Sequence, residues 1–401
     1  MTIVAEIGTA HGGSLQKAYS LIDAACDAGA DCIKFQWVYA DEILHPDTGF
    51  VTLPGGKTRL YDRFKALETD SSFFKSCLEY THKKGLMFAC SPFGLKSLEE
   101  LVKIQPDAIK IASPEVNHTP LLKATASYYG KIPIILSSGV STLGDIEKAI
   151  DTITSKNEIT AHSTLKMPYL TLLHCITFYP APEEEYNVKV VDSLKRIFGY
   201  STGISDHSLD PVLIPVLSVL EGGTMIEKHI TLSRATDGLD DPVALEPQQF
   251  AQMVHSVHQT EAILNRYHNE ELSLNGGFDT DLEADYFKSG FSKKGIQQVL
   301  NQLYDQYGKE KVLTSLGNGV KTLAQSEKLN YGRTNRSLHY MKNLSKGSII
   351  KPQDIAVLRT EKILTPGISP DFLETITGSI LARDVKSGDG VLLEDFINKK
   401  S

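Results

Sequence analysis

The chain has 401 residues, of which 41% are hydrophobic and 22% charged, and its formal net charge at pH 7 is −8. These proportions are ordinary for a globular protein and exclude a collagen-like or largely disordered chain. The acidic balance argues against a nucleic-acid groove or an anionic membrane surface as the main partner. No apolar run reaches the roughly 20 residues that a membrane helix needs.

The five cysteines are an odd number without a paired C-x-x-C spacing, and most of them lie within apolar runs. This usage is typical of reduced core residues. The start of the chain meets the charged Glu6 at once and carries no signal-peptide pattern. We therefore expect a cytoplasmic protein.

Short β-rich runs alternate with helical patterns through the first 265 residues. The segment 14–25, which follows the first run, has helical spacing and ends near Gly29, a residue suited to the end of a helix. Eight strands are predicted in this way, at 2–8, 32–36, 86–91, 108–113, 133–138, 171–176, 202–205 and 224–231.

Strand, helix and strand repeated eight times predict a (β/α)8 barrel, also called a TIM barrel. Parallel strands need crossover connections, and eight of them can close into a barrel. We assign this α/β domain to residues 1–265. A doubly wound open sheet is the structural alternative.

The pattern changes after the barrel. Residues 266–334 are predicted to be a linker with an inserted amphipathic helix: Gly276, Gly277 and the acidic run 279–285 indicate a loop, whereas apolar residues recur at spacings of three and four from Ile296 to Tyr307. The tail, 335–401, is predicted to be a small β-rich domain. Its segment 342–355 reappears as 383–396, an offset of 41 that indicates two halves with pseudo-twofold symmetry.

Polar side chains stand at the ends of the predicted barrel strands. In a barrel these ends meet at the C-terminal mouth, where enzymes of this fold place their chemistry. For any single residue a solvated strand end is the alternative, but the pattern recurs on strand after strand. The residues concerned are Glu6, Lys34, Gln36, Lys110, Ser113, Glu115, Ser137, Ser138, Ser205, Asp206, His207, Glu227 and His229.

His207 and His229 end the seventh and eighth predicted strands. Neutral imidazole is the commonest metal ligand among side chains, and a two-histidine site completed by water or substrate suits a Lewis-acid divalent ion. We considered Asp206 as the group that orients one of the imidazoles. Two histidines hydrogen-bonded at strand ends are the alternative, and the pattern alone leaves both open.

The mouth also carries cations, hydroxyls and carboxylates. Lys34 and Lys110, together with serines at positions 113, 137 and 205, match a phosphate monoester better than an aromatic or lipid ligand. Glu6 and Glu115 are candidates for proton transfer or water activation. No glycine-rich loop of nucleotide-binding type is present, so a nucleotide cofactor is not indicated.

Several short motifs follow one another along the barrel and into the tail. This ordered set resembles the sialic acid synthase family, including the legionaminic and pseudaminic acid synthases, and the tail resembles the antifreeze-like (SAF) domain that follows the barrel in that family. The motifs are Ala5-Glu6-Ile7-Gly8, His11-Gly12-Gly13-Ser14, Ile33-Lys34-Phe35-Gln36, Lys110-Ile111-Ala112-Ser113 with Glu115, Leu136-Ser137-Ser138-Gly139, Tyr179-Pro180, Ser205-Asp206-His207, Glu227-Lys228-His229 and, in the tail, Val357-Leu358-Arg359.

The resemblance implies a reaction in which phosphoenolpyruvate condenses with an open-chain N-acyl mannosamine-type sugar. The products are a nonulosonic acid and inorganic phosphate. By this likeness a divalent metal, Mn²⁺ with Mg²⁺ or Co²⁺ as alternatives, polarises the sugar aldehyde, and Arg359 reaches the sugar from the partner subunit of a domain-swapped homodimer. The implied roles are metal ligands His207 and His229; phosphoenolpyruvate ligands Lys34, Lys110, Ser113, Ser137 and Ser205; sugar ligands Gln36, Tyr179, Asp240 and Arg359; and catalytic groups Glu6, Glu115 and Lys110.

Two departures from the family pattern leave the sugar open. Ala10 and Thr177 stand where the family commonly has asparagine, so a diacetamido-trideoxy sugar of the legionaminic or pseudaminic type is an alternative acceptor. A synthase that makes a shorter sugar acid, a spore-coat or polysaccharide paralogue, and a non-catalytic sugar-binding or ice-binding scaffold are further alternatives. Retention of Glu6, both lysines and both histidines argues against a scaffold, since binding alone does not need the whole set.

Overall fold

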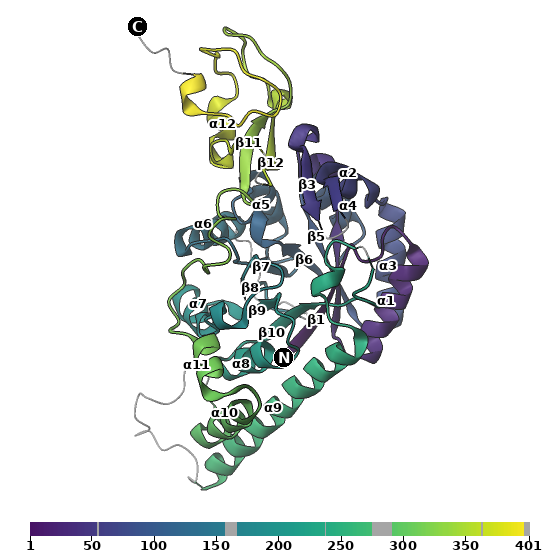
Figure 1. Cartoon of the computed structure of the whole chain (residues 1–401), viewed down its shortest axis with the longest axis vertical. Coiled ribbons are helices and arrows are strands. Elements are labelled where there is room, and N and C mark those ends of the chain that lie inside the picture. The colour runs from purple at the N-terminus through teal and green to yellow at the C-terminus, as the bar shows by residue number, and fades with distance from the viewer. Residues whose placement is uncertain (54–55, 157–166, 237, 275–290, 362–363, 397–401) are drawn as a thin grey trace.

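The computed structural model describes residues 1–53, 56–156, 167–236, 238–274, 291–361 and 364–396 (Figure 1). Eight parallel strands close into a barrel in the order β1-β10-β9-β8-β7-β6-β5-β2. The predicted TIM barrel is confirmed, and the open sheet is excluded. The strands are β1 (Thr2–Gly8), β2 (Cys32–Trp37), β5 (Met87–Pro92), β6 (Ala108–Ile111), β7 (Ile134–Ser137), β8 (Leu170–Cys175), β9 (Ser201–Asp206) and β10 (Met225–His229).

Helices follow the strands in turn and cover the outside of the barrel. Their apolar faces and the outward-facing strand residues form one large hydrophobic core. A short hairpin of β3 (Phe50–Leu53) and β4 (Gly56–Arg59), followed by α2 (Leu60–Ala66), is inserted after β2. The covering helices are α1 (Leu15–Asp27), α3 (Ser71–Lys83), α4 (Leu95–Lys103), α5 (Thr119–Thr125), α6 (Leu143–Thr154), α7 (Val190–Phe198), α8 (Leu213–Leu220) and α9 (Pro247–Leu274).

The inside of the barrel has an apolar layer near its middle. Side chains of a strand alternate between its two faces, so residues two apart share the barrel interior. One residue from each of seven strands contributes to a second, separate hydrophobic cluster, and Gly203 of β9 takes the eighth place, where a Cβ would lie 2.1 Å from the Met225 carbonyl oxygen. The seven residues are Val4, Cys32, Ala89, Ala108, Ile135, Leu173 and Met225.

Two residues further along each strand, the interior becomes polar. This step of two brings the next inward-facing side chain of every strand to the C-terminal side of the apolar layer. We call these eight residues the polar ring, and all of them are buried. They are Glu6, Lys34, Ser91, Lys110, Ser137, Cys175, Ser205 and Glu227.

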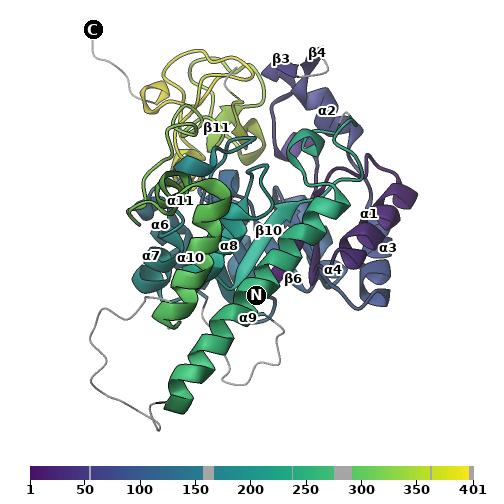
Figure 2. The same ribbon diagram turned by 60° about the horizontal axis from the view of Figure 1, so that its bottom comes forward.

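The helix predicted after the barrel is α10 (Lys293–Tyr307), which buries Ile296, Val299 and Leu303. It packs along α9, as the second view shows, and α11 (Lys309–Leu316) follows it (Figure 2). The insertion therefore thickens the helical layer of the barrel. The loop predicted before it, at Gly276, Gly277 and the acidic run 279–285, lies outside the described residues.

The second domain contains β11 (Arg336–Tyr340) paired antiparallel with β12 (Ile355–Arg359), the short helix α12 (Leu373–Ile376) and a small hydrophobic core. Its bridges follow the predicted repeat. The bridge Leu344↔Val385 joins two positions 41 apart, and adding or subtracting 41 turns His339↔Gly390 into Ile349↔Ile380. Such a pattern is what a pseudo-twofold axis produces.

Two further expectations concern chemistry rather than topology. All five cysteines are free, and four of them are buried. In the part of the chain that the structure describes, no helix combines the length and the apolarity needed to cross a membrane.

Candidate active site

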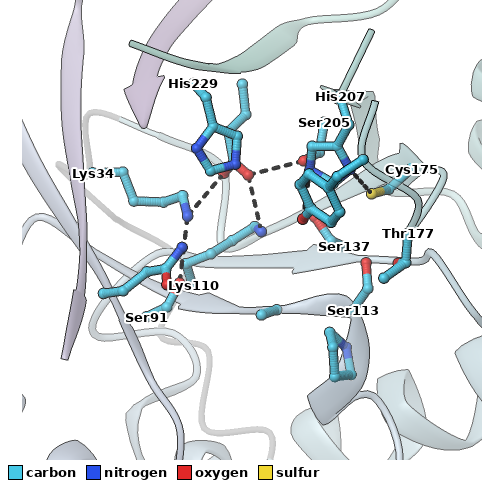
Figure 3. A pocket seen from close by; sticks show the side chains of 15 residues that line it. Lys34, Ser91, Lys110, Ser113, Ser137, Cys175, Thr177, Ser205, His207 and His229 are labelled. Carbon is cyan, nitrogen blue, oxygen red and sulfur yellow. Dashed lines mark hydrogen bonds and ion pairs between the residues drawn. The ribbon is translucent and has the colours of Figure 1, made fainter. Parts of the chain in front are cut away.

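A pocket opens at the C-terminal mouth of the barrel (Figure 3). Its floor is seven of the eight residues of the polar ring, and its upper wall comes from residues beyond the strand ends. Of the residues predicted from the sequence, the pocket brings together Lys34, Gln36, Lys110, Ser113, Ser137, Tyr179, Ser205, His207 and His229.

Ion pairs hold the two lysines of the polar ring. Lys110 Nζ lies 3.3 Å from Glu227 Oε1, and Lys34 Nζ lies 3.7 Å from Glu227 Oε2. Lys34 also forms a close ion pair with Glu6, which accepts a hydrogen bond from Gln36 Nε2 at 3.1 Å. Ser205 Oγ donates to Glu227 Oε1 at 2.9 Å. Two carboxylates thus lie against two ammonium groups, and all four side chains are buried.

Burial and charge act in opposite directions on these groups. Burial lowers the pKa of Lys34 to about 8, and the nearby Lys110 lowers it as well, while Glu227 raises it. Burial would raise the pKa of Glu227, but the two lysines outweigh burial and bring that pKa to about 2. Glu227 is therefore ionised at neutral pH and serves as the shared counter-ion.

The two histidines lie side by side in the pocket wall, at the ends of the neighbouring strands β9 and β10 (Figure 3). Their ring centroids lie 5.7 Å apart. His207 Nδ1 is 2.7 Å from the carbonyl oxygen of Ile176, which can only accept a hydrogen bond, so Nδ1 carries the proton and Nε2 offers a lone pair. The Tyr179 hydroxyl donates to that Nε2 at 3.2 Å, and the Tyr179 ring stacks on His207.

These donors fit a divalent metal. An imidazole whose second nitrogen donates to a carbonyl is the usual arrangement of a metal-bound histidine. The pKa of His229 is held well below its ordinary value by burial and by His207, which keeps its ring neutral and able to bind a cation. The pKa of His207 is raised, against the effect of burial, by Cys175 and Ile176, and both act on Nδ1, away from Nε2. Among the described residues no group of three or more His, Cys, Asp or Glu side chains gathers as a metal site, so water or substrate would complete the shell.

Asp206 does not orient either histidine, contrary to our prediction. It pairs with Lys228, whose Nζ lies 2.6 Å from Asp206 Oδ2 and 2.6 Å from the carbonyl oxygen of Ser208. Both charged groups point away from the pocket, because each lies one residue out of step with the inward positions. This buried pair secures the two strands that carry the histidines.

Gly8 marks the point where three predicted residues converge. Its φ is +56°, and a Cβ at this position would lie 2.9 Å from Glu6 Oε1, 3.1 Å from Gln36 Nε2 and 3.5 Å from Asp240 Oδ2. A carboxylate, an amide and a second carboxylate thus meet beside the lysines. Burial raises the pKa of Asp240, which brings this carboxyl closer to protonation than usual.

Glu115 has a different place from the one that we expected. It is fully buried and does not line the pocket described above; its Oε1 accepts from Arg336 Nη2 at 2.6 Å and from Arg359 Nη2 at 2.9 Å. Both arginines belong to the second domain. Glu115 therefore acts here as the group to which the second domain docks, and its part in proton transfer stays a prediction.

Arg336 was not predicted, although its guanidinium makes several hydrogen bonds from the second domain to the barrel. Besides Glu115, its guanidinium donates to the carbonyl oxygens of Phe93, Glu42 and Val357. Arg359 stands over the Phe93 ring, 5.2 Å from its centroid. In this single chain Arg359 contacts Glu115 and Phe93 of its own barrel, and its contribution to a partner subunit stays a prediction.

The pocket also contains residues that the sequence reasoning did not assign to a ligand. These are Ser91, Cys175, Thr177 and Glu227, together with Ala112 and Pro114. Glu227 had been predicted at the mouth without a role. A simple signal would have found two of the others, because Ser91 and Cys175 follow an apolar inward residue of their strand by two positions. Ala10 belongs to the outer hydrophobic core rather than to the pocket, whereas Thr177 lines it.

Comparisons with known proteins agree with this architecture. Over 402 residues the chain is 29% identical to the spore coat polysaccharide biosynthesis protein SpsE of Bacillus subtilis, covering 100% of this chain and 94% of that protein. It is 28% identical to the N,N'-diacetyllegionaminic acid synthase of Legionella pneumophila (98% and 93% covered) and 29% identical to a pseudaminic acid synthase of Campylobacter jejuni (98% and 96% covered).

Solved structures give the same result. The crystal structure of SpsE superimposes with a TM-score of 0.74 at 28% identity, covering 100% of this chain and 96% of that one. The N-acetylneuraminic acid (sialic acid) synthetase of Leptospira borgpetersenii, in complex with citrate, gives 0.58 at 30% identity, covering 70% and 92%. The SAF domain model matches residues 335–397, and the model of the NeuB family matches residues 21–269. With that match over more than half of its length, the chain belongs to the NeuB family.

Proposed function

We propose that this protein joins phosphoenolpyruvate to the aldehyde of an open-chain N-acyl mannosamine-type sugar, giving a nonulosonic acid and inorganic phosphate. The observation that carries the proposal is the pocket itself: two buried lysines and a set of serine hydroxyls lie beside two histidines in one enclosed mouth. The names of the relatives, among them legionaminic and pseudaminic acid synthases, support the same class of product.

The phosphate end of phosphoenolpyruvate has a suitable cradle. Lys34 and Lys110 supply positive charge, and serines 113, 137 and 205 supply hydroxyl donors. Ser137 Oγ is buried and has no hydrogen-bond partner among the described residues, as expected of a donor kept for a ligand. Ligand entry would draw Lys110 away from Glu227 and toward the phosphate.

A divalent metal held by His207 and His229, Mn²⁺ by expectation and Mg²⁺ or Co²⁺ as alternatives, would polarise the carbonyl oxygen of the sugar aldehyde. Carbon 3 of phosphoenolpyruvate forms the new bond to the aldehyde carbon, whose oxygen gains a proton. Water then adds to carbon 2 and gives its proton to a base, a role that we propose for Glu6, whose carboxylate pairs with Lys34. The bond from carbon 2 to the bridging oxygen then breaks as the new carbon 2 hydroxyl loses its proton and becomes the keto group. Phosphate leaves with the bridging oxygen and takes up that proton, and the lysines would stabilise its charge.

The sugar side of the pocket would be formed by Gln36, Tyr179, Asp240 and Arg359. A diacetamido-trideoxy sugar of the legionaminic or pseudaminic type remains the alternative acceptor, and the nearly equal identities to both kinds of synthase favour neither. Thr177 lines the pocket and Ala10 does not, so Thr177 is the departure from the family pattern that bears on the sugar. A cytoplasmic, domain-swapped homodimer is also part of the proposal.

An acceptor panel tests the proposed function. Purified protein with Mn²⁺ and phosphoenolpyruvate is given N-acetylmannosamine, its 6-phosphate or either diacetamido sugar, and inorganic phosphate and product mass are followed. With one of the acceptors we expect phosphoenolpyruvate to release phosphate. A product whose mass equals that of the acceptor plus pyruvate should form at the same rate. If phosphoenolpyruvate releases no phosphate with any of the four sugars, the proposal is contradicted.

Metal removal should stop the reaction. We expect chelator-treated protein to release no phosphate and added Mn²⁺ to restore release, and we expect His229→Ala to lose at least about 100-fold in kcat even with Mn²⁺, because one of two protein ligands is gone. The exposed His255 on α9 gives a control, since His255→Ala should match wild type. Full turnover of the chelated enzyme would rule out the role assigned to the histidines.

The lowered pKa of Lys34 predicts a pH limit. The ammonium form binds the anionic substrate, and the free enzyme loses that proton near pH 8 rather than near pH 10.5. Above pH 8 the kcat/KM for phosphoenolpyruvate should therefore fall about tenfold per pH unit. Lys34→Arg keeps its charge throughout this range, so its remaining activity should not show the fall. A wild-type profile that stays flat to pH 9.5 is the opposing result.

A further inference from the structure

The linker between α11 and β11 reaches over the rim of the barrel mouth. It passes α7 and α6 before it enters the second domain (Figure 1). Near its end, three linker side chains bind the backbone of two loop residues that flank the pocket. These loop residues are Val140, which follows β7, and Thr177, which follows β8.

Each loop residue has both backbone groups bound by the linker. The Glu327 carboxylate accepts from Val140 N at 2.9 Å through one oxygen and from Thr177 N at 3.1 Å through the other. Asn335 Nδ2 donates to the Val140 carbonyl oxygen at 3.1 Å, and Asn330 Nδ2 donates to the Thr177 carbonyl oxygen at 2.9 Å. Beyond the ends of β7 and β8 the two strands no longer pair with each other. These four hydrogen bonds to the linker hold the two loops there instead.

These four hydrogen bonds, which we call the clamp, are buried and hold a constrained backbone. Glu327 is 1% exposed, and burial raises the pKa of its carboxyl while Lys321 lowers it. Val140 has a φ of +43°, a left-handed conformation that a β-branched residue adopts only when its surroundings impose it. The hydrogen bond that Val140 N donates to Glu327 and the one that the Val140 carbonyl oxygen accepts from Asn335 fix the backbone on either side of this residue.

One peptide group connects the clamp to the candidate metal site. The N–H of Thr177 donates to Glu327, and the carbonyl on the other side of the same peptide bond, that of Ile176, accepts from His207 Nδ1. A trans peptide is planar, with its N–H and C=O pointing in opposite directions, so fixing one end fixes the other. Hydrogen bonds in such a chain also polarise one another.

We propose that Glu327 is a positioning residue for His207, acting through the Ile176–Thr177 peptide. By fixing this peptide it keeps the proton of His207 on Nδ1 and points Nε2 into the pocket. Glu327 touches neither substrate nor metal. The inference deepens the proposed function, on which its meaning for catalysis rests, and it makes the linker part of the site.

The test compares Glu327→Ala with Glu185→Ala in the full chain. Glu185 also accepts a hydrogen bond from the linker, from Ser326 N at 2.8 Å, and binds neither loop residue through any described contact, so its variant controls for loosening of the linker. In metal-free protein, nitrogen NMR of the histidine rings reports the tautomer of His207, assigned by the signal missing from His207→Asn. Co²⁺ binding, followed by its visible absorption, reports the strength of the histidine pair.

In wild type and Glu185→Ala we expect a single Nδ1–H tautomer and the same Co²⁺ affinity within twofold. In Glu327→Ala we expect a mixture of tautomers and an affinity about tenfold weaker or more, the usual effect of losing an outer partner. An unchanged tautomer and affinity in Glu327→Ala, alongside a lower Tm, would reduce Glu327 to a structural role. The NMR signal needs neither metal nor substrate, so it decides this question even when the acceptor panel contradicts the proposed function.

Discussion

Closure of eight parallel strands around one axis is the constraint on which this structure depends. It turns the alternation of side chains along each strand into layers, and the second layer brings Glu6, Lys34, Lys110 and Glu227 into one buried space. Burying an unpaired charge costs several kcal/mol, so these four groups can share the space only as balanced pairs. The balance leaves both lysines buried beside carboxylates that an anionic ligand could replace. The proposed binding of the phosphate end of phosphoenolpyruvate depends on that exchange.

The parts outside the barrel act on the same mouth. The second domain docks through Arg336 and Arg359 on Glu115, two residues along the chain from Ser113 in the pocket wall. The linker reaches the other side and fixes the Ile176–Thr177 peptide through Glu327. Both contacts bury charged groups with several hydrogen bonds each, which makes them costly to break. The segments after the barrel therefore shape the site as well as cover it.

Periodicity along the chain was enough to predict the barrel. The local residue pattern predicts each strand and helix, and eight strand–helix units can pack together in few ways. The same local rule placed His207, His229, Glu227 and the two lysines at the mouth, and a stricter use of the step of two would have added Ser91 and Cys175. What the sequence could not provide was pairing between distant segments. Glu115 was predicted as a catalytic carboxylate, and its contact with Arg336, 221 positions away, could not be foreseen from the sequence. Asp206 looked like a partner of histidine until Lys228 was seen to occupy it. The partner of such a carboxylate depends on which residues lie near it in three dimensions, and the spacing of residues along the sequence does not predict this.

The central claim is that this mouth joins carbon 3 of phosphoenolpyruvate to an aldehyde and expels phosphate from carbon 2. Phosphoenolpyruvate carrying ¹⁸O in the bridging position between carbon 2 and phosphorus tests it most directly, with the phosphate and the sugar acid analysed by mass after turnover. Water addition at carbon 2 followed by C–O cleavage predicts that all the label leaves in phosphate. Label retained in the sugar acid would mean cleavage of the P–O bond and would contradict the account.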